Sequence, residues 1–287
     1  KDMLELGKIQ ELEVIKEKDF GIYLCEPGKN AEGTEKGVLL PKKQVPEGTK
    51  TGDLLRVFLY KDSEDRIIAT TSTPKLTLGE TAVLTVKEVS KIGAFLDMGL
   101  EKDLLLPFKE QIYPVRKGER CLVGLYIDKS KRLAATMKAY SLLRSDSPYK
   151  TGDEVDGFIF EINPELGAFV AVDERYYGMI PKRELFAGFK VGQDIHARVT
   201  RVREDGKLDL SSREKAHNQI FDDAELVMKV LGEFDGVLPF NDKASPEVIA
   251  REFKLSKNAF KRAVGHLLKE GKIEITEKSI RALEEKK

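Results

Sequence analysis

The sequence contains no tryptophan and only two cysteines, Cys25 and Cys121, which lie far apart in the chain. Two distant cysteines exclude a disulfide scaffold, and such sparse use is typical of a reducing compartment, so we expect a cytoplasmic protein. Long apolar runs are missing as well, and none approaches the roughly 18 residues that a membrane-spanning helix requires. We therefore expect no membrane partner.

An excess of charge of either sign is also missing. Lys and Arg number 49 and Asp and Glu number 49 in a chain of 287 residues, so the net charge is zero although 34% of the residues are charged. This balance excludes the broadly basic surface of histone-like nucleic-acid binders. Any surface for a nucleic acid must therefore be local, and the positive excess is concentrated in residues 76–147 and in one helix near the C-terminus.

The residue combinations that carry catalysis or bind metals are absent too. His196, His217 and His266 have no cysteine or carboxylate partners at metal-ligand spacing, which argues against a zinc site. The sequence has no glycine-rich phosphate loop that ends in Lys-Ser or Lys-Thr. We expect neither an enzyme nor a bound metal or cofactor.

What the sequence does contain is a threefold internal repeat. Each copy has an early glycine, a short run with a glycine and an aromatic residue, an apolar run ending in proline, a second glycine and a basic residue, in that order. The proline and the following glycine are equally spaced in all three copies, which makes chance an unlikely origin. The aromatic runs are Gly21-Ile22-Tyr23-Leu24, Gly93-Ala94-Phe95-Leu96 and Gly167-Ala168-Phe169-Val170.

Within each copy the residue pattern is that of short strands. Val155–Ile162 alternates with period two, and turn residues punctuate each copy at short intervals. A unit this small removes its exposed sheet edges by closing into a barrel. The sequence predicts a mainly β protein of three tandem five-stranded OB-fold barrels, over residues 1–75, 76–147 and 148–216, followed by a C-terminal α+β domain.

The C-terminal domain, expected over residues 222–287, has helical periodicity. Asp222–Gly232 predicts one helix, Ser245 and Pro246 mark the start of a second, and Ser256 caps a third. A strand follows Gly271, so three helices and a β ribbon predict a winged helix-turn-helix. The expected apolar positions of the third helix are Phe260, Ala263, Val264, Leu267 and Leu268.

The three barrels resemble the S-one domain, the repeated RNA-binding domain of the large ribosomal small-subunit protein. The matching motifs are clearest in Gly167-Ala168-Phe169-Val170, Gly192-Gln193-Asp194 and Lys207-Leu208-Asp209-Leu210-Ser211. Three such domains before a winged helix resemble the bacterial conserved virulence factor B family, which is regarded as RNA-binding and as affecting expression of virulence genes. The resemblance implies an RNA partner and carries no catalytic motif.

The resemblance also implies which barrel residues contact RNA, because S-one domains stack bases on aromatic side chains beside the glycine of the second strand. The matching aromatic positions are Phe20, Tyr23, Phe95 and Phe169. The arginine of the family's Asp-x-x-x-Arg motif matches Arg66 and Arg132, and in the third copy Arg203 and Lys207 replace this motif. The family's histidine is missing, because its positions hold Leu40, Leu106 and Pro181.

The third copy has two further aromatic residues, Phe158 and Phe160, on its first strand. If Ile159 points inward, strict alternation places both outward, where large apolar side chains are costly unless they are covered. They either stack on RNA or pack against a neighbouring domain. Arg198 and Arg201 on the fourth strand are candidates for phosphate contacts, with an ordinary solvated face as the alternative.

The third C-terminal helix presents a polar, mainly basic face opposite its apolar residues. A recognition helix offers such a face to a groove or a phosphate track, although many winged helices bind proteins instead. The residues of this face are Lys257, Asn258, Lys261 and Arg262.

These patterns lead to one leading hypothesis and two alternatives. The leading hypothesis is a non-enzymatic regulator of gene expression that holds single-stranded RNA on its barrels, with the winged helix as a basic clamp. The first alternative is a DNA-binding transcription regulator that reads duplex DNA with the winged helix. The second is an adaptor that binds proteins.

Overall fold

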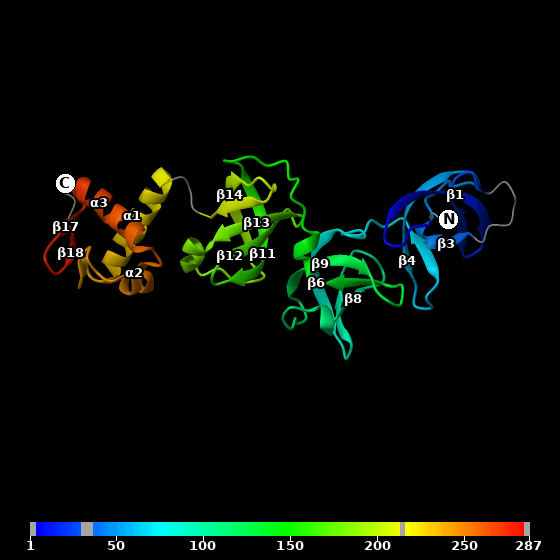
Figure 1. Ribbon diagram of the computed structural model, residues 1–287, viewed down its shortest axis with the longest axis horizontal. Coiled ribbons are helices and arrows are strands. Elements are labelled where there is room, and N and C mark those ends of the chain that lie inside the picture. The colour runs from blue at the N-terminus through cyan, green and yellow to red at the C-terminus, as the bar shows by residue number, and fades with distance from the viewer. Residues whose placement is uncertain (1–3, 30–36, 213–215, 284–287) are drawn as a thin grey trace. The chain divides into compact units, whose positions relative to one another are not determined.

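The computed structural model describes residues 4–29, 37–212 and 216–283 (Figure 1). The chain forms two compact units, one made of residues 1–144 and 173–177 and the other of residues 145–172 and 178–287. Three sets of five strands come first, and helices with a small sheet follow, so the predicted fold class is confirmed.

The first barrel is closed by hydrogen bonds in the strand order β1-β2-β3-β5-β4. Its first strand shows why it folds this way, because Leu12 and Val14 alternate with exposed residues and are buried in the barrel core. The barrel closes where β3 and β5 run parallel, with Leu39 opposite Ile68. The strands are β1 (Ile9–Lys18), β2 (Gly21–Cys25), β3 (Val38–Pro41), β4 (Leu54–Lys61) and β5 (Ile67–Thr70).

The second barrel differs, because its strand order β10-β9-β6-β7-β8 leaves β8 and β10 as the two edges of the sheet. The predicted five-stranded barrel is present in this copy, and it is nearly closed, because β8 and β10 lie beside each other without completing the ring of paired strands. Leu104 and Leu106 of β8 and Ala135 of β10 lie in one apolar core, so side-chain packing curves the sheet. The strands are β6 (Thr81–Val89), β7 (Gly93–Leu96), β8 (Leu104–Pro107), β9 (Arg120–Ile127) and β10 (Leu133–Thr136).

The core of the second barrel includes a residue of the first. Phe58 of β4 is fully buried within this core, and the partly buried Ile9 and Tyr60 pack against it. A buried phenylalanine contributes roughly 1.5–3 kcal/mol through removal of its apolar surface from water. The first barrel keeps its own core, and Phe58 extends from it into the core of the second barrel, which fixes β4 against the second barrel.

The third barrel is closed in the order β11-β12-β13-β15-β14. As in the first barrel, a parallel pair completes it, with Gly178 opposite Leu208 and Met179 opposite Asp209. The strands are β11 (Glu154–Asn163), β12 (Gly167–Val172), β13 (Tyr176–Pro181), β14 (Asp194–Val202) and β15 (Leu208–Ser211). Short 3₁₀ helices accompany the barrels: η2 (Lys42–Gln44), η3 (Phe108–Glu110), η4 (Ala139–Leu142) and η5 (Lys182–Ala187).

The glycine that opens the second strand of each barrel is required by close backbone contact. Gly21, Gly93 and Gly167 have φ of +153°, +151° and +144°, a region that L side chains rarely adopt. A Cβ atom at these glycines would lie only 2.2, 2.3 and 2.0 Å from the carbonyl oxygens of Leu40, Leu106 and Ile180, respectively. The repeated glycine thus allows the backbone at the start of the second strand to lie very close to the backbone of the third strand.

The C-terminal region has the predicted helices and ribbon. The cap predictions are confirmed, because the Ser245 hydroxyl accepts from the Val248 N–H and the Ser256 hydroxyl from the Ala259 N–H. The first helix begins earlier than expected, and Leu268 is 47% exposed, so its assignment to the apolar face is wrong. The elements are α1 (Ala216–Glu233), β16 (Val237–Leu238), α2 (Pro246–Phe253), α3 (Lys257–Lys269), β17 (Ile273–Ile275) and β18 (Ile280–Ala282).

Leu268 is exposed because it lies one position beyond the buried side of α3, which is formed by Phe260, Ala263, Val264 and Leu267. β17 and β18 follow α3 in the chain and are neighbours in the sheet order β16-β18-β17. They form the β ribbon that follows the third helix of a winged helix. Across the described ranges of the chain, no helix is both long and apolar enough to cross a membrane.

Candidate nucleic-acid interface

The first barrel presents an exposed aromatic pair beside β2. Phe20, in the turn before Gly21, is 57% exposed, and its ring lies edge-on to that of Tyr23 with centroids 6.2 Å apart. The Lys42 N–H donates to the Phe20 carbonyl oxygen at 3.0 Å, which holds the turn against η2. Both rings therefore lie at the surface, in a position where a base could stack.

Arg66 lies immediately before β5, near enough to Tyr23 for the two side chains to interact electrostatically. Its Nε and Nη2 atoms donate to Asp62 at 2.9 and 2.8 Å, and Nη1 lies 2.8 Å from Glu64. The structure therefore brings Phe20, Tyr23 and Arg66 together. These carboxylates hold the guanidinium, so a phosphate must compete with them in an exposed, solvent-screened ion pair.

The second barrel combines a partly exposed Phe95 with Ile92, which is 60% exposed. The side chain of Arg132 is not paired within its own barrel as that of Arg66 is in the first. The Asp128 carboxylate accepts from the Arg132 backbone N–H at 3.0 Å, whereas the guanidinium binds Asp65 of the first barrel, with Nε 2.6 Å from Oδ1. The basic residue predicted for the second barrel is thus engaged by the first.

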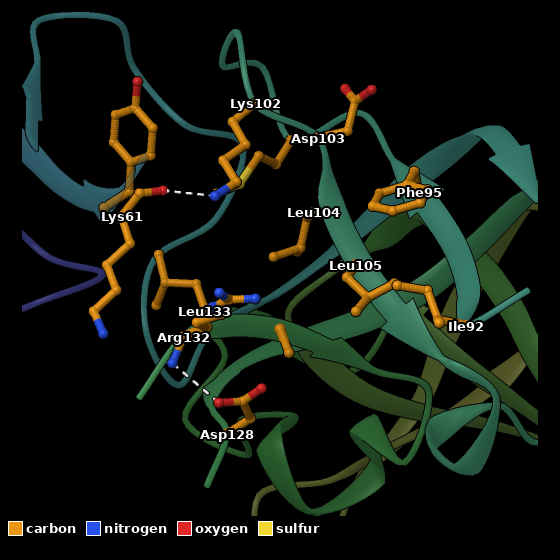
Figure 2. Close-up of a pocket in the computed structure, with 13 residues that line it drawn as sticks. Lys61, Ile92, Phe95, Lys102, Asp103, Leu104, Leu105, Asp128, Arg132 and Leu133 are labelled. Carbon is orange, nitrogen blue, oxygen red and sulfur yellow. Dashed lines mark hydrogen bonds between the residues drawn. The ribbon is translucent and has the colours of Figure 1, made fainter. Parts of the chain in front are cut away.

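Ile92, Phe95, Asp128 and Arg132 line a cavity of about 250 Å³ where the first barrel meets the second (Figure 2). β7, β8 and β10 supply one side, and Tyr60 and Lys61 of β4 line it from the first barrel. Lys102, from the loop before β8, bridges the two barrels because its ammonium donates to the carbonyl oxygens of Lys61 and Asp62 at 2.9 and 2.8 Å.

The aromatic residues of the third barrel are buried. Phe158, Phe160 and Phe169 are 2%, 5% and 6% exposed, so the expectation that Phe158 and Phe160 lie exposed on the outer face is wrong. A β-bulge between Ile159 and Glu161 breaks the period-two alternation on which that expectation rested, and three consecutive residues become buried. The Phe160 and Phe169 rings lie 6.3 Å apart, so Phe160 packs beside an aromatic ring of its own barrel.

The basic residues of the third barrel are mostly paired with carboxylates. Arg203 binds Asp209 through Nε and Nη2 at 2.9 and 2.6 Å, and the Lys207 ammonium lies 3.2 Å from Asp205. Arg201 is exposed. The basic residues of β14 therefore differ in exposure, because Arg201 is exposed whereas Arg198 is half-buried.

His196, also on β14, lies between two carboxylates. Its Nδ1 atom is 2.8 Å from Asp156, and its Nε2 atom is 3.5 Å from Glu154. The hydrogen bond to Asp156 raises the pKa of His196 above its ordinary value. The neighbouring acids offset the added charge, which makes this histidine a poor phosphate ligand.

The polar face of α3 lies where the sequence places it. Asn258, Lys261 and Arg262 are exposed and Lys257 is half-buried, opposite the packed side of the helix. Among the residues that the structure describes, none of these three cations is recorded in an ion pair. The face is therefore open to an anionic partner.

Two features of the second barrel were not predicted. Phe108 follows the proline of the repeat, where the other copies have Lys42 and Lys182, and it is exposed beside the exposed Ile112. The signal was an apolar residue in an otherwise basic position. The presence of Lys61 and Lys102 at the junction cavity could not be predicted from the sequence, because it depends on how two copies of the repeat contact each other.

Comparison with protein families assigns each domain. Residues 6–72 and 78–138 match the S1 domain model, and residues 149–213 match the S1 RNA binding domain model, which describes the S-one barrel. Residues 225–281 match the CvfB-like winged helix domain. These models describe nucleic-acid-binding domains of the S-one type and a winged helix, and no catalytic domain is among the matches.

Relatives match over nearly the whole chain. An uncharacterized protein, YitL, of Bacillus subtilis is 29% identical, covering 95% of this chain and 92% of the relative. Conserved virulence factor B of Staphylococcus haemolyticus is 28% identical, covering 98% of each. A solved multidomain protein with nucleic acid binding domains from Streptococcus pneumoniae is 26% identical, covers 97% of this chain and 98% of its own, and has a TM-score of 0.48.

Proposed function

The chain belongs to the conserved virulence factor B family, and on this premise we propose that it is a non-enzymatic, cytoplasmic RNA-binding protein that regulates gene expression. It holds single-stranded RNA on its barrels by stacking and phosphate contact. The winged helix adds a basic face that grips the same RNA.

The exposed pair of Phe20 and Tyr23, with Arg66 beside it, carries this proposal. Exposed aromatic side chains cost free energy in water, and a base that stacks on them offsets that cost. Stacking is worth about 1–3 kcal/mol per base and tolerates any sequence. The nearby guanidinium supplies the charge that a phosphate requires.

A weak grip by each domain is compatible with tight binding overall. The cations of the barrels are largely paired with carboxylates, so each phosphate contact displaces an existing partner. Linked domains make the second contact intramolecular, which raises the overall affinity without new contacts. The open face of α3 supports a role as the additional grip.

The test uses the absence of tryptophan. In the variant Phe20→Trp, a single indole reports on the first barrel, and an unstructured RNA should quench its emission. Affinity should fall as salt rises, with a slope that counts the phosphates contacted. A salt-independent affinity, or an emission that RNA leaves unchanged, would refute the proposed mode of binding.

Duplex DNA is the second candidate ligand, because the exposed Lys261 and Arg262 on α3 suit a groove as well as a single strand. Competition between duplex DNA and single-stranded RNA for the full chain separates the two functions. RNA binding supports the proposal if it survives a large excess of duplex. Loss of RNA binding in favour of duplex supports the DNA-binding alternative.

A further inference from the structure

A cavity of about 230 Å³ lies in the first barrel, where β1 and β4 meet the segment that follows β5. It is lined by three apolar residues, by Arg56 and by the run of four hydroxyl residues Thr70–Thr73. None of these residues belongs to the aromatic face that Phe20, Tyr23 and Arg66 form. The cavity is smaller than the roughly 300–1,000 Å³ of pockets for drug-sized ligands, so it suits a small ion or chemical group.

The lining of this cavity carries positive charge and no negative charge, because Arg56 lines it and no aspartate or glutamate does. The Arg56 side chain is exposed, and within the described ranges no ion pair is recorded for it. The arginines beside the fifth strands differ, because carboxylates bind Arg66, Arg132 and Arg203. Glu11 lies opposite Arg56 in the β1–β4 pairing, but it does not line the cavity. The guanidinium of Arg56 is therefore available to an anion.

One side-chain amide fixes most of the hydroxyl run. The Oε1 atom of Gln44 accepts from three consecutive hydroxyls at 3.0, 3.0 and 3.2 Å, those of Thr70, Thr71 and Ser72. Among the residues that the structure describes, no hydrogen bond is recorded for the hydroxyl or the backbone N–H of Thr73. The buried Pro74 follows and restricts the backbone of Thr73 to extended conformations. Thr73 thus has two unused donors, and it lines the same cavity as Arg56.

Gln44 is also a residue at which the first barrel differs from the other two. It lies three positions after the proline of the repeat, where the second and third barrels have Glu110 and Glu184. Those carboxylates accept from the hydroxyl that ends the fifth strand, from Thr136 at 2.7 Å and from Ser211 at 2.9 Å. Gln44 makes the same contact as a neutral amide. The first barrel therefore lacks the negative charge that would repel an anion at this end of the strand.

We propose that this cavity is a binding site for a compact oxyanion, either a free phosphate ion or the phosphate group of a small phosphorylated metabolite. Arg56 supplies charge-assisted hydrogen bonds in a planar arrangement that suits two phosphate oxygens, and the hydroxyl of Thr73 supplies a further donor. Val57 and Phe58 are buried and keep water from part of the lining, which strengthens the attraction between opposite charges. The site does not depend on RNA binding.

An oxyanion in this cavity also links two parts of the chain. Arg56 belongs to β4, whereas Thr73 belongs to the segment that leads to the second barrel. Leu76 of that segment is buried in the core of the second barrel. An anion that binds both Arg56 and Thr73 therefore ties β4 to this segment. Because a ligand of the folded state stabilises it by mass action, phosphate should also raise the thermal transition of the full chain.

The decisive measurement is a nuclear magnetic resonance titration of the full chain, labelled with nitrogen-15, in a buffer without phosphate. Inorganic phosphate is added at constant ionic strength against sodium chloride, so that screening stays the same. The amide signal of Thr73 should shift and saturate with phosphate, whereas chloride should leave it unchanged. Ribose 5-phosphate is titrated in the same way, with ribose as its control.

Each outcome of these titrations decides a point. A response to phosphate alone identifies the free ion as the ligand, and a stronger response to ribose 5-phosphate identifies a phosphorylated metabolite. If neither compound shifts the amide signal of Thr73, the proposal is overturned. It is also overturned if an oligouridylate decamer without terminal phosphates shifts this signal and inorganic phosphate does not, because RNA would then be the occupant.

Two variants extend the test. Gln44→Glu keeps the hydrogen-bond acceptor and introduces the charge that the other two barrels have, so it should weaken phosphate binding about three- to tenfold. Arg56→Gln should weaken it about tenfold or more, because charge-assisted hydrogen bonds are lost. Arg116→Gln, the matched change at an exposed arginine of the second barrel, should leave it unchanged. Amide signals outside the first barrel verify that each variant is folded, and wild-type affinity in both Gln44→Glu and Arg56→Gln would overturn the proposal.

Discussion

The guanidinium of Arg132 in the second barrel donates two hydrogen bonds to the carboxylate of Asp65 in the first, one from Nε at 2.6 Å and one from Nη2. This carboxylate occupies the position that a phosphate oxygen pair would take. The hydrogen bonds from Arg132 lower the pKa of Asp65, so the pair stays ionised well below neutral pH. Under the proposed function, this internal acid competes with RNA for the basic residue of the second barrel.

The variant Asp65→Asn should therefore bind RNA more tightly. Freed from its carboxylate, Arg132 can contact a phosphate, and we expect a two- to fivefold gain in affinity at low salt with a salt slope steeper by about one. Equilibrium titrations with an unstructured RNA at several salt concentrations measure both. Glu47→Gln removes a comparable exposed charge and should give little change. A loss of affinity in Asp65→Asn would mean that the pair orients Arg132 instead of blocking it.

The repeated glycine should be irreplaceable. In Gly93→Ala the new Cβ would lie 2.3 Å from the Leu106 carbonyl oxygen at a φ of +151°, so the second barrel must distort. We expect a loss of about 1–3 kcal/mol or more, seen as a lower thermal transition. Gly265→Ala on α3 has open space and ordinary backbone angles, and it should stabilise by about 0.5–1 kcal/mol. Equal effects of the two changes would contradict the argument from close contact.

Both cysteines should be inert in the folded protein. Burial raises the pKa of Cys121 to about 12, and Cys25 is likewise buried. Because the thiolate is the reactive form, only on the order of one Cys121 in ten thousand is reactive at pH 8. A colorimetric thiol reagent should find no reactive thiol in the native chain and two after denaturation. Rapid labelling under native conditions would show that the barrel opens on the timescale of the reaction.

His196 should titrate above the ordinary value of about 6.5, because its hydrogen bond to Asp156 favours the charged ring. A folded pKa above the unfolded one means that the stabilisation is complete below the unfolded pKa. It is then lost as pH rises through the folded pKa. Nuclear magnetic resonance of the ring protons measures this titration, and Asp156→Asn should lower the pKa. An unchanged pKa in that variant would assign the shift to another group.

The sequence was most informative about the three barrels, because their landmark residues repeat. The equal spacing of proline and glycine in three copies predicted three barrels, because each landmark serves one contact within its own copy. Gly93 shows this, since its close neighbour Leu106 lies in the same repeat. The caps Ser245 and Ser256 were equally readable, because a cap binds backbone only three residues away.

The features that the sequence did not reveal depend on contacts between distant segments. The bulge beside Phe160 changes which residues face inward, and a period-two pattern contains no sign of it. The partner of Arg132 is Asp65 in another copy of the repeat, and comparison of the copies cannot reveal a contact between two of them. The second sheet ends at β8 and β10 without the parallel pair that closes the other two barrels, and no residue spacing specifies this difference.

The burial of Phe58 in the core of the second barrel has a consequence for recognition. Two modules joined by a loose tether would lose relative freedom each time both engaged one ligand, and binding would bear that entropic loss. Here the loss is incurred once, during folding. The spacing between Phe20 in the first barrel and Phe95 in the second is therefore set by folding. Under the proposed function it favours RNA strands in which the number of nucleotides between the two contacts matches that spacing.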